Sequence, residues 1–185
     1  MPALVLLLLA GLLYVGRDAV GAEITQLTDE YTRWDTLFKK YSKISGVPWR
    51  WIKAVCWVES DLGRADSVAY GLEHPEETEA SKSSDGKSWG LMQTIITTSN
   101  EMRPGTTIAD LNNPEISIMI GAKVLGRNLR KFPNNRTSVF RAYNGGLGFA
   151  STVAGQRDTP AYAAKVEDRL ARILLKQPGD EMEIG

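Results

Sequence analysis

Apolar residues recur every three or four positions over long stretches of this 185-residue chain. Such spacing places apolar side chains on one face of an α-helix. We find neither a convincing stretch of strict apolar–polar alternation, which would indicate a half-buried strand, nor an internal repeat. The pattern therefore predicts a mainly α fold, and the length fits one domain with its own hydrophobic core.

Glycine, proline and asparagine divide this pattern into segments. Helices are expected over residues 23–45, 48–60, 94–102 and 114–132, over a short stretch that leads into Tyr143, and over 160–177. Residues 61–87 lose the helical spacing and are expected to form a long surface loop, a feature that is often functional in a compact domain. We thus expect an N-terminal amphipathic helix (23–45) packed on a main domain (46–177), followed by a flexible tail (178–185).

Charge and cysteine content exclude several classes of function. The chain has 22 Lys and Arg against 22 Asp and Glu, so its zero net charge offers no reason to expect nucleic acid as a partner. Cys56 is the only cysteine, which excludes an intramolecular disulfide, and apolar neighbours favour a packed thiol over a reactive one. With a single histidine as well, a Cys/His metal site is not expected.

The N-terminus carries a continuous apolar run at residues 3–15. This run is shorter than the ~20 residues of a membrane-spanning helix but fits the core of a secretory signal. Small residues before Glu23 resemble a cleavage site, so residues 1–22 are interpreted as a signal peptide. An uncleaved signal anchor, which would attach the protein to a membrane, and a buried N-terminal helix are the alternatives. The first two predict an exported protein of the periplasm or cell envelope.

Glu59 ends an otherwise apolar helical face shared with Ile52, Val55 and Cys56. Burial beside apolar groups disfavours the ionised carboxylate and raises its pKa. A carboxylic acid that remains protonated near neutral pH can donate a proton to a glycosidic oxygen. The alternative is a structural Glu59 that caps the helix or pairs with Arg64.

Two further segments carry polar groups beside glycine. In "SWGLMQ" (88–93), Gly90 permits close approach of the backbone, and Gln93 offers a donor and acceptors to a sugar hydroxyl or to the acid. In "RAYNGGLG" (141–148), Tyr143 can stack on a sugar ring and Asn144 can hydrogen-bond an N-acetyl group or the acid. Taken singly, the first segment is equally compatible with a helix start and the second with a core aromatic residue before a turn.

The order of these segments resembles the soluble lytic transglycosylase family and its relative, goose-type lysozyme. The resemblance covers roughly residues 46–175 and implies a lysozyme-like helical fold that needs no metal or organic cofactor. It identifies Glu59 as the single catalytic acid. It implies substrate-binding roles for Ser88, Met92, Gln93, Tyr143, Asn144 and Tyr162, the last of which would reach towards the acid.

The resemblance implies cleavage of the β-1,4 bond between N-acetylmuramic acid and N-acetylglucosamine in peptidoglycan. Glu59 would protonate the bridging oxygen and then deprotonate the muramyl C6 hydroxyl, which leaves a 1,6-anhydro end. A muramidase that hydrolyses the same bond with water is the first alternative. A non-catalytic glycan-binding protein of a cell wall or virion is the second. Bacterial wall remodelling, secretion and phage entry remain equally open as roles.

Two departures from the family's pattern concern this choice. The interval between Glu59 and the Gly-Leu-Met-Gln motif is long, as in goose-type lysozymes, and ends near Asp85. Asp85, or second to it Asp66, would supply the water-activating carboxylate of a hydrolase; the alternative is an Asp85–Gly86 turn. The other departure is Ser117, at a position where the family often has asparagine.

Overall fold

A computed structural model describes residues 30–77, 80–84, 86–152 and 160–178. The expectations for the signal segment, for Asp85 and for the tail beyond residue 178 lie outside these residues. The chain divides into two units, residues 1–34 and 35–185. In the described part of the first unit, helix continues to residue 32 and a turn occupies 33–34.

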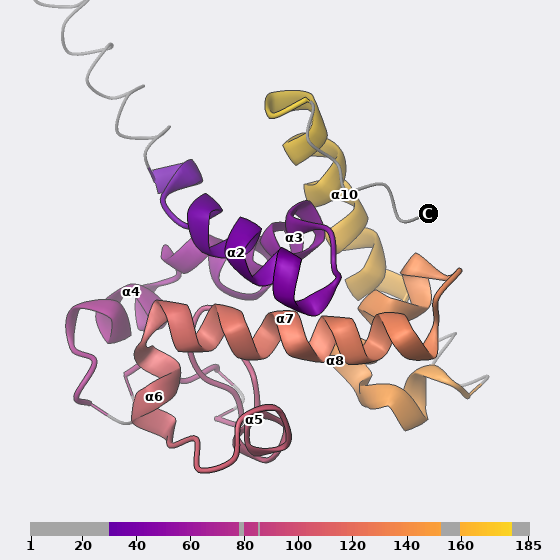
Figure 1. The fold of residues 1–185 in the computed structure, drawn as a ribbon. Coiled ribbons are helices and arrows are strands. Elements are labelled where there is room, and N and C mark those ends of the chain that lie inside the picture. Colours follow the sequence, from indigo (N-terminus) through magenta and orange to yellow (C-terminus); the bar gives the residue numbers. More distant parts are fainter. Residues whose placement is uncertain (1–29, 78–79, 85, 153–159, 179–185) are drawn as a thin grey trace, which may run out of the picture. The chain divides into compact units, whose positions relative to one another are not determined.

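The second unit is a compact helical domain (Figure 1). The structure is 71% helical, and its described residues contain no strand or sheet, which confirms the mainly α prediction. The helices are α2 (Asp35–Ser45), α3 (Trp49–Ser60), α4 (Asp66–Glu73), α5 (Ile96–Met102), α6 (Ile108–Asn112), α7 (Pro114–Lys131), α8 (Arg136–Ala150) and α10 (Pro160–Lys176), with a 3₁₀ turn η1 at Asp61–Gly63. No helix in the described ranges is both long and apolar enough to span a membrane.

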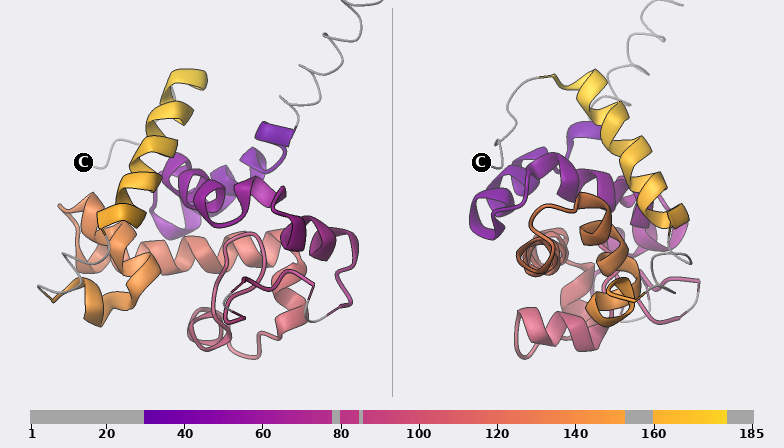
Figure 2. Two further views of the ribbon diagram at one scale, coloured as in Figure 1. Left: turned by 180° about the vertical axis from the view of Figure 1, so that it is seen from behind. Right: turned by 90° about the vertical axis from the view of Figure 1, so that its right-hand side faces the viewer.

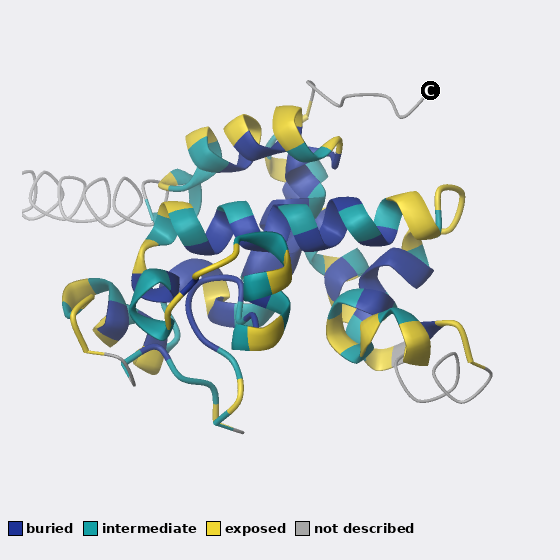
Figure 3. Cartoon of the chain, turned by 60° about the horizontal axis from the view of Figure 1, so that its bottom comes forward, coloured by how far each residue is buried: buried dark blue, intermediate teal, exposed yellow. Residues whose placement is uncertain are grey.

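Helix α7 is the centre of the domain, and α2 and α3 lie on one side of it with α5 and α6 on the other (Figures 1 and 2). Asn113 begins α7 as the sequence predicts, because its side chain accepts hydrogen bonds from the first backbone N–H groups at 2.9 and 3.2 Å. The buried faces of several helices, α7 among them, meet in the interior (Figure 3). The buried residues of α7 include Ile118, Ile120, Val124 and Leu125.

Helix α10 packs against α3 and α8. Its C-terminal end is held by a buried polar cluster, in which the fully buried Lys53 donates to Asp35 at 2.7 Å and to Gln177 at 2.9 Å. Gln177 in turn donates to Asp35 at 2.7 Å. Burial lowers the pKa of Lys53, and the hydrogen bond and charge of Asp35 oppose that effect. The cluster joins α2, α3 and the residue after α10, so it fixes how α10 lies on α3.

The sequence-based boundaries need three corrections. The helix expected over 23–45 is interrupted at 33–34, because apolar spacing continues across a two-residue turn without revealing it. The segment 61–87 is not a continuous loop but contains η1 and α4, a helix too short to show a clear apolar period. The five-residue α6 was not expected at all, and its Thr107 forms a capping box with Asp110.

Candidate active site

Glu59 lies in the last turn of α3, which ends abruptly after it. Asp61 and Leu62 follow with φ values of 53° and 59°, in the left-handed region that side chains other than glycine rarely adopt. Ser60 stabilises this turn, because its hydroxyl accepts from the backbone N–H of Gly63 at 3.2 Å. Two strained residues next to a candidate acid fit the tendency of backbone strain to collect at functional sites.

The carboxyl group of Glu59 is mostly surrounded by protein and yet keeps some access to solvent. Loss of hydration raises the pKa of Glu59 to about 7, although a hydrogen bond from the Tyr162 hydroxyl at 2.5 Å acts in the opposite direction. The alternative pairing with Arg64 does not occur, since Arg64 binds Asp61 at 2.9 Å. Glu59 is thus a carboxylic acid that is still about half protonated at neutral pH.

The "SWGLMQ" segment forms a tight loop docked onto α6 and α7. Gly90 has a φ of 78°, and a Cβ at this position would lie 2.1 Å from the carbonyl oxygen of Leu111, so only glycine fits. The fully buried Ser117 accepts a hydrogen bond from the backbone N–H of Met92 at 3.1 Å. The serine that departs from the family's usual residue therefore has a definite role in holding this loop.

Met92 and Gln93 take different places in that loop. The Met92 side chain is fully buried and fills the space above Gly121, where a Cβ would lie 2.6 Å from it. Met92 therefore lines neither of the two pockets described below, although it was expected to contact substrate. Gln93 has a φ of 44° and lines a pocket that it shares with Glu59. Its amide nitrogen donates to the carbonyl oxygens of Gly90 and Ser81 at 2.8 and 3.1 Å, which leaves its oxygen to face Ser88 at 3.4 Å.

Helix α8 supplies the third part of the site. The Tyr143 hydroxyl donates to the Met92 carbonyl oxygen at 2.7 Å, and this bond ties α8 to the loop. Burial first and the charge of Glu59 second raise the pKa of Tyr143 well above its usual value, so it stays neutral. Asn144 is exposed on the same wall, and Gly146, with a φ of 81°, interrupts the helix where the sequence predicts a break.

Two pockets meet at Glu59. The first, named here the Gln93 pocket, has a volume of about 330 Å³ and is lined by Glu59, Ser88, Gln93, Arg127, Tyr143 and Asn144, among others. The second, named the α10 pocket, has a volume of about 660 Å³ and lies between the end of α3 and one face of α10. Its lining includes Trp57, Glu59, Asp61, Lys165, Asp168 and Arg169.

Most of the predicted site residues are thus gathered around one acid. Ser88, Gln93, Tyr143 and Asn144 share a pocket with Glu59, and Tyr162 bonds to it directly. The exception is Met92, whose side chain lines neither pocket and whose backbone is hydrogen-bonded to Ser117 and Tyr143. The α10 pocket was not predicted from the sequence, although its lining residues 161, 164, 165, 168 and 169 are spaced by three and four along one face of the last helix.

The second carboxylate predicted for a hydrolase, Asp85 or Asp66, is not among the described residues that line these pockets. Asp66 is exposed on α4 and lines neither pocket. The α10 pocket instead contains Asp61 and Asp168, which form ion pairs with arginines at 2.9 Å. Asp85 lies outside the described residues.

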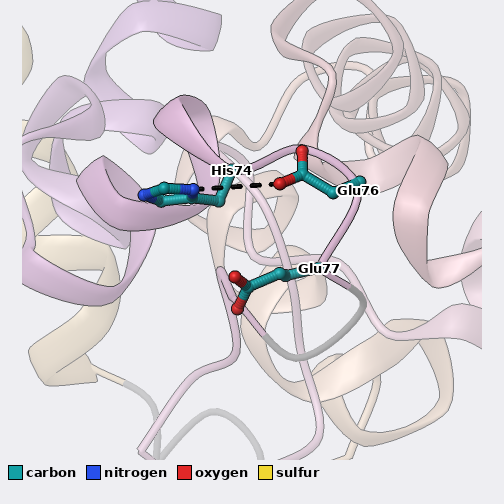
Figure 4. Close-up of side chains that lie close together, drawn as sticks. All are labelled: His74, Glu76 and Glu77. Atoms are coloured by element: carbon teal, nitrogen blue, oxygen red, sulfur yellow. Dashed lines mark ion pairs between the residues drawn. The ribbon is translucent and has the colours of Figure 1, made fainter.

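One cluster in the described ranges has metal-ligand chemistry. His74, Glu76 and Glu77 bring one ligand atom each to within 4.8 Å of one another on the segment after α4 (Figure 4). The His74 side chain is partly exposed and that of Glu76 largely so, and Glu77 accepts from the Tyr70 hydroxyl at 3.1 Å. None of the three lines a pocket beside Glu59, so this cluster has no part in the chemistry of that acid.

Fold and site together define a helical protein with one partly desolvated glutamic acid between two pockets. Residues 36–165 match the family described as "Transglycosylase SLT domain", and the chain belongs to this family. Membership supports, at family level, a lytic transglycosylase-type function that acts on peptidoglycan. No curated protein and no solved structure matches the chain significantly.

Proposed function

We propose that this protein cleaves the β-1,4 bond between N-acetylmuramic acid and N-acetylglucosamine in peptidoglycan and leaves a 1,6-anhydromuramyl end. The observation that carries the proposal is Glu59, an acid whose pKa of about 7 suits both proton donation and proton removal near neutral pH. Its position at the junction of two pockets supports binding of a glycan chain on both sides of the cleaved bond.

The reaction needs one carboxyl group in two successive roles. Glu59 first gives its proton to the bridging oxygen as the bond from that oxygen to the muramyl C1 breaks. The resulting carboxylate then removes the proton of the muramyl C6 hydroxyl while this oxygen bonds to C1. Glu59 regains its proton, no water is consumed, and no cofactor takes part.

Tyr162 and the loop support these two roles. The Tyr162 hydroxyl donates to Glu59, so it stabilises the carboxylate that forms after the first proton transfer. It also holds one of the two carboxyl oxygens of Glu59, a residue that lines both pockets. On the Gln93 pocket wall, Tyr143 and the exposed Asn144 are available to contact the sugar.

Among the described residues, which do not include Asp85, the bonding of the carboxylates near Glu59 favours the transglycosylase over the hydrolase. An inverting hydrolase needs a second carboxylate that is free to activate water on the opposite face of the sugar. Asp61 accepts from Trp57 and from Arg64, and Asp168 accepts from Arg169 and Arg172. Both aspartates are thus hydrogen-bonded as counter-ions of arginines and are not free to activate water.

The proposal is tested with purified peptidoglycan sacculi as substrate. The wild-type protein should release soluble muropeptides, and Glu59→Gln should lower that rate by at least about a thousandfold because no other group replaces the acid. Glu73→Gln, the same change at an exposed position outside both pockets, is the matched control and should retain full activity. Release that is unchanged in Glu59→Gln would refute the role of Glu59 as the acid, whereas no release by the wild-type protein would support a non-catalytic glycan-binding protein.

We also propose that the protein is exported to the cell envelope, since the apolar run at 3–15 fits a signal segment and peptidoglycan lies outside the cytoplasm. Fractionation of expressing cells, with N-terminal sequencing of the product, tests this. A mature N-terminus near residue 23 is expected for a cleaved signal, whereas full-length protein in the cytosolic fraction contradicts export.

A further inference from the structure

The face of α10 that borders the α10 pocket combines small and charged residues. Ala161 and Ala164 line its N-terminal part, where short side chains leave the space beside Glu59 open. Lys165 and Arg169 follow one helical turn apart on the same face. The resulting pocket is about twice as large as the Gln93 pocket, at about 660 against 330 Å³.

The charges around this pocket do not balance. Asp61 is paired with Arg64, and Asp168 with both Arg169 and Arg172. The described residues contain no ion-pair partner for Lys165, which is exposed on the pocket wall. The pocket and its bordering ion pairs thus hold four cations, Arg64, Lys165, Arg169 and Arg172, against two carboxylates beside a largely protonated Glu59 at pH below 7.

The guanidinium of Arg169 is held in place by the ring of Trp57. It lies 4.9 Å from the ring centre of Trp57, a cation–π arrangement that also keeps the side chain against the pocket wall. The indole nitrogen of Trp57 donates to Asp61 at 2.9 Å, which fixes the ring. An ordered guanidinium beside an uncompensated amine is suited to an anionic group such as a carboxylate.

We infer that the α10 pocket receives the carboxylate-bearing stem peptide attached to the muramyl residue. This inference rests on the proposed function. The sugar rings are uncharged and give no reason for excess positive charge, whereas the stem peptide carries carboxylates. The peptide is joined to the same muramyl ring whose C1 reacts at Glu59, so it must leave the glycan close to that acid. Lys165 and Arg169 are then specificity residues that favour peptide-bearing over peptide-free glycan.

The test compares one glycan in two forms, intact and after enzymatic removal of its peptides by an amidase. For each variant, the quantity measured is the ratio of kcat/KM on peptide-bearing glycan to kcat/KM on peptide-free glycan. Lys165→Met should lower this ratio about tenfold, and Lys165→Glu should lower it further. Lys131→Met, which removes the same charge at an exposed site outside both pockets, should keep the wild-type ratio.

The outcomes separate this inference from the proposed function. A ratio unchanged in Lys165→Met, Lys165→Glu and Arg169→Gln overturns the inference even if cleavage is normal. So does a ratio that falls only when Arg127, the cation of the Gln93 pocket, is replaced by Gln. If the wild-type protein cleaves neither glycan, the proposed function fails. Calorimetric binding of a peptide-bearing muropeptide to Glu59→Gln, with and without Lys165→Met, then still decides whether the pocket holds the peptide.

Discussion

Replacement of Glu59 by glutamine should make the folded protein more stable at pH 8 but not at pH 4. The pKa of Glu59 rises from its usual 4.5 to about 7 on folding, chiefly through burial. Below pH 4.5 the group is protonated in both folded and unfolded protein and has no effect. Between pH 4.5 and 7 only the unfolded state releases the proton readily, so the stability of the wild type falls as the pH rises.

The size of this effect follows from the two pKa values. A difference of about 2.5 units corresponds to about 3 kcal/mol in the free energy of unfolding, reached near pH 7 and constant above it. Glutamine keeps the shape and does not titrate. Urea unfolding of the wild type and of Glu59→Gln at several pH values therefore isolates this group, because other titrations cancel in the difference.

The stability difference between the two proteins should change by about 3 kcal/mol in favour of the variant between pH 4 and pH 8. Glu73→Gln serves as the control, since it makes the same change on an exposed side chain. A difference that stays flat over this range would mean that folding does not raise the pKa of Glu59, and the reasoning about the acid would be wrong.

Three further substitutions test how the site is held. Tyr162→Phe removes a hydrogen bond that lowers the pKa of Glu59, so the alkaline limb of the pH–rate profile should move to higher pH; an unmoved limb contradicts the bond. Gly90→Ala should cost at least about 3 kcal/mol of stability, because it combines positive φ with a steric clash, whereas Gly46→Ala, with positive φ in open space, should cost only about 1 kcal/mol. Equal losses on thermal unfolding would refute the clash. Ser117→Ala leaves a buried backbone N–H without its acceptor and should cost about 1–3 kcal/mol in urea unfolding, where no loss would mean that the loop does not depend on it.

Helices with strong local signals were predictable from sequence. Asn113 followed by a proline and a long apolar stripe specifies α7, because the cap and the period act within one segment. The end of α3 could not be predicted in this way. Asp61 and Leu62 adopt left-handed conformations, which are unusual above all for leucine, and the hydrogen bond from Gly63 to Ser60 and the packing of the buried Leu62 support them.

The same distinction applies to the site. Glu59 was identifiable because a carboxylate on an apolar face is unusual in itself. The role of Met92 was not, since sequence cannot tell a side chain that lines a pocket from one that packs behind its wall. The α10 pocket also escaped prediction, because Lys165 and Arg169 resemble an ordinary solvated helix face until α3 is placed opposite them.

The most direct test of the central claim is mass spectrometry of the muropeptides released from sacculi in water enriched in heavy oxygen. If Glu59 activates the substrate's own C6 hydroxyl, the muramyl ends will be 1,6-anhydro forms without heavy oxygen. Reducing muramyl ends that carry heavy oxygen would show that water is the nucleophile, and would contradict the transglycosylase mechanism.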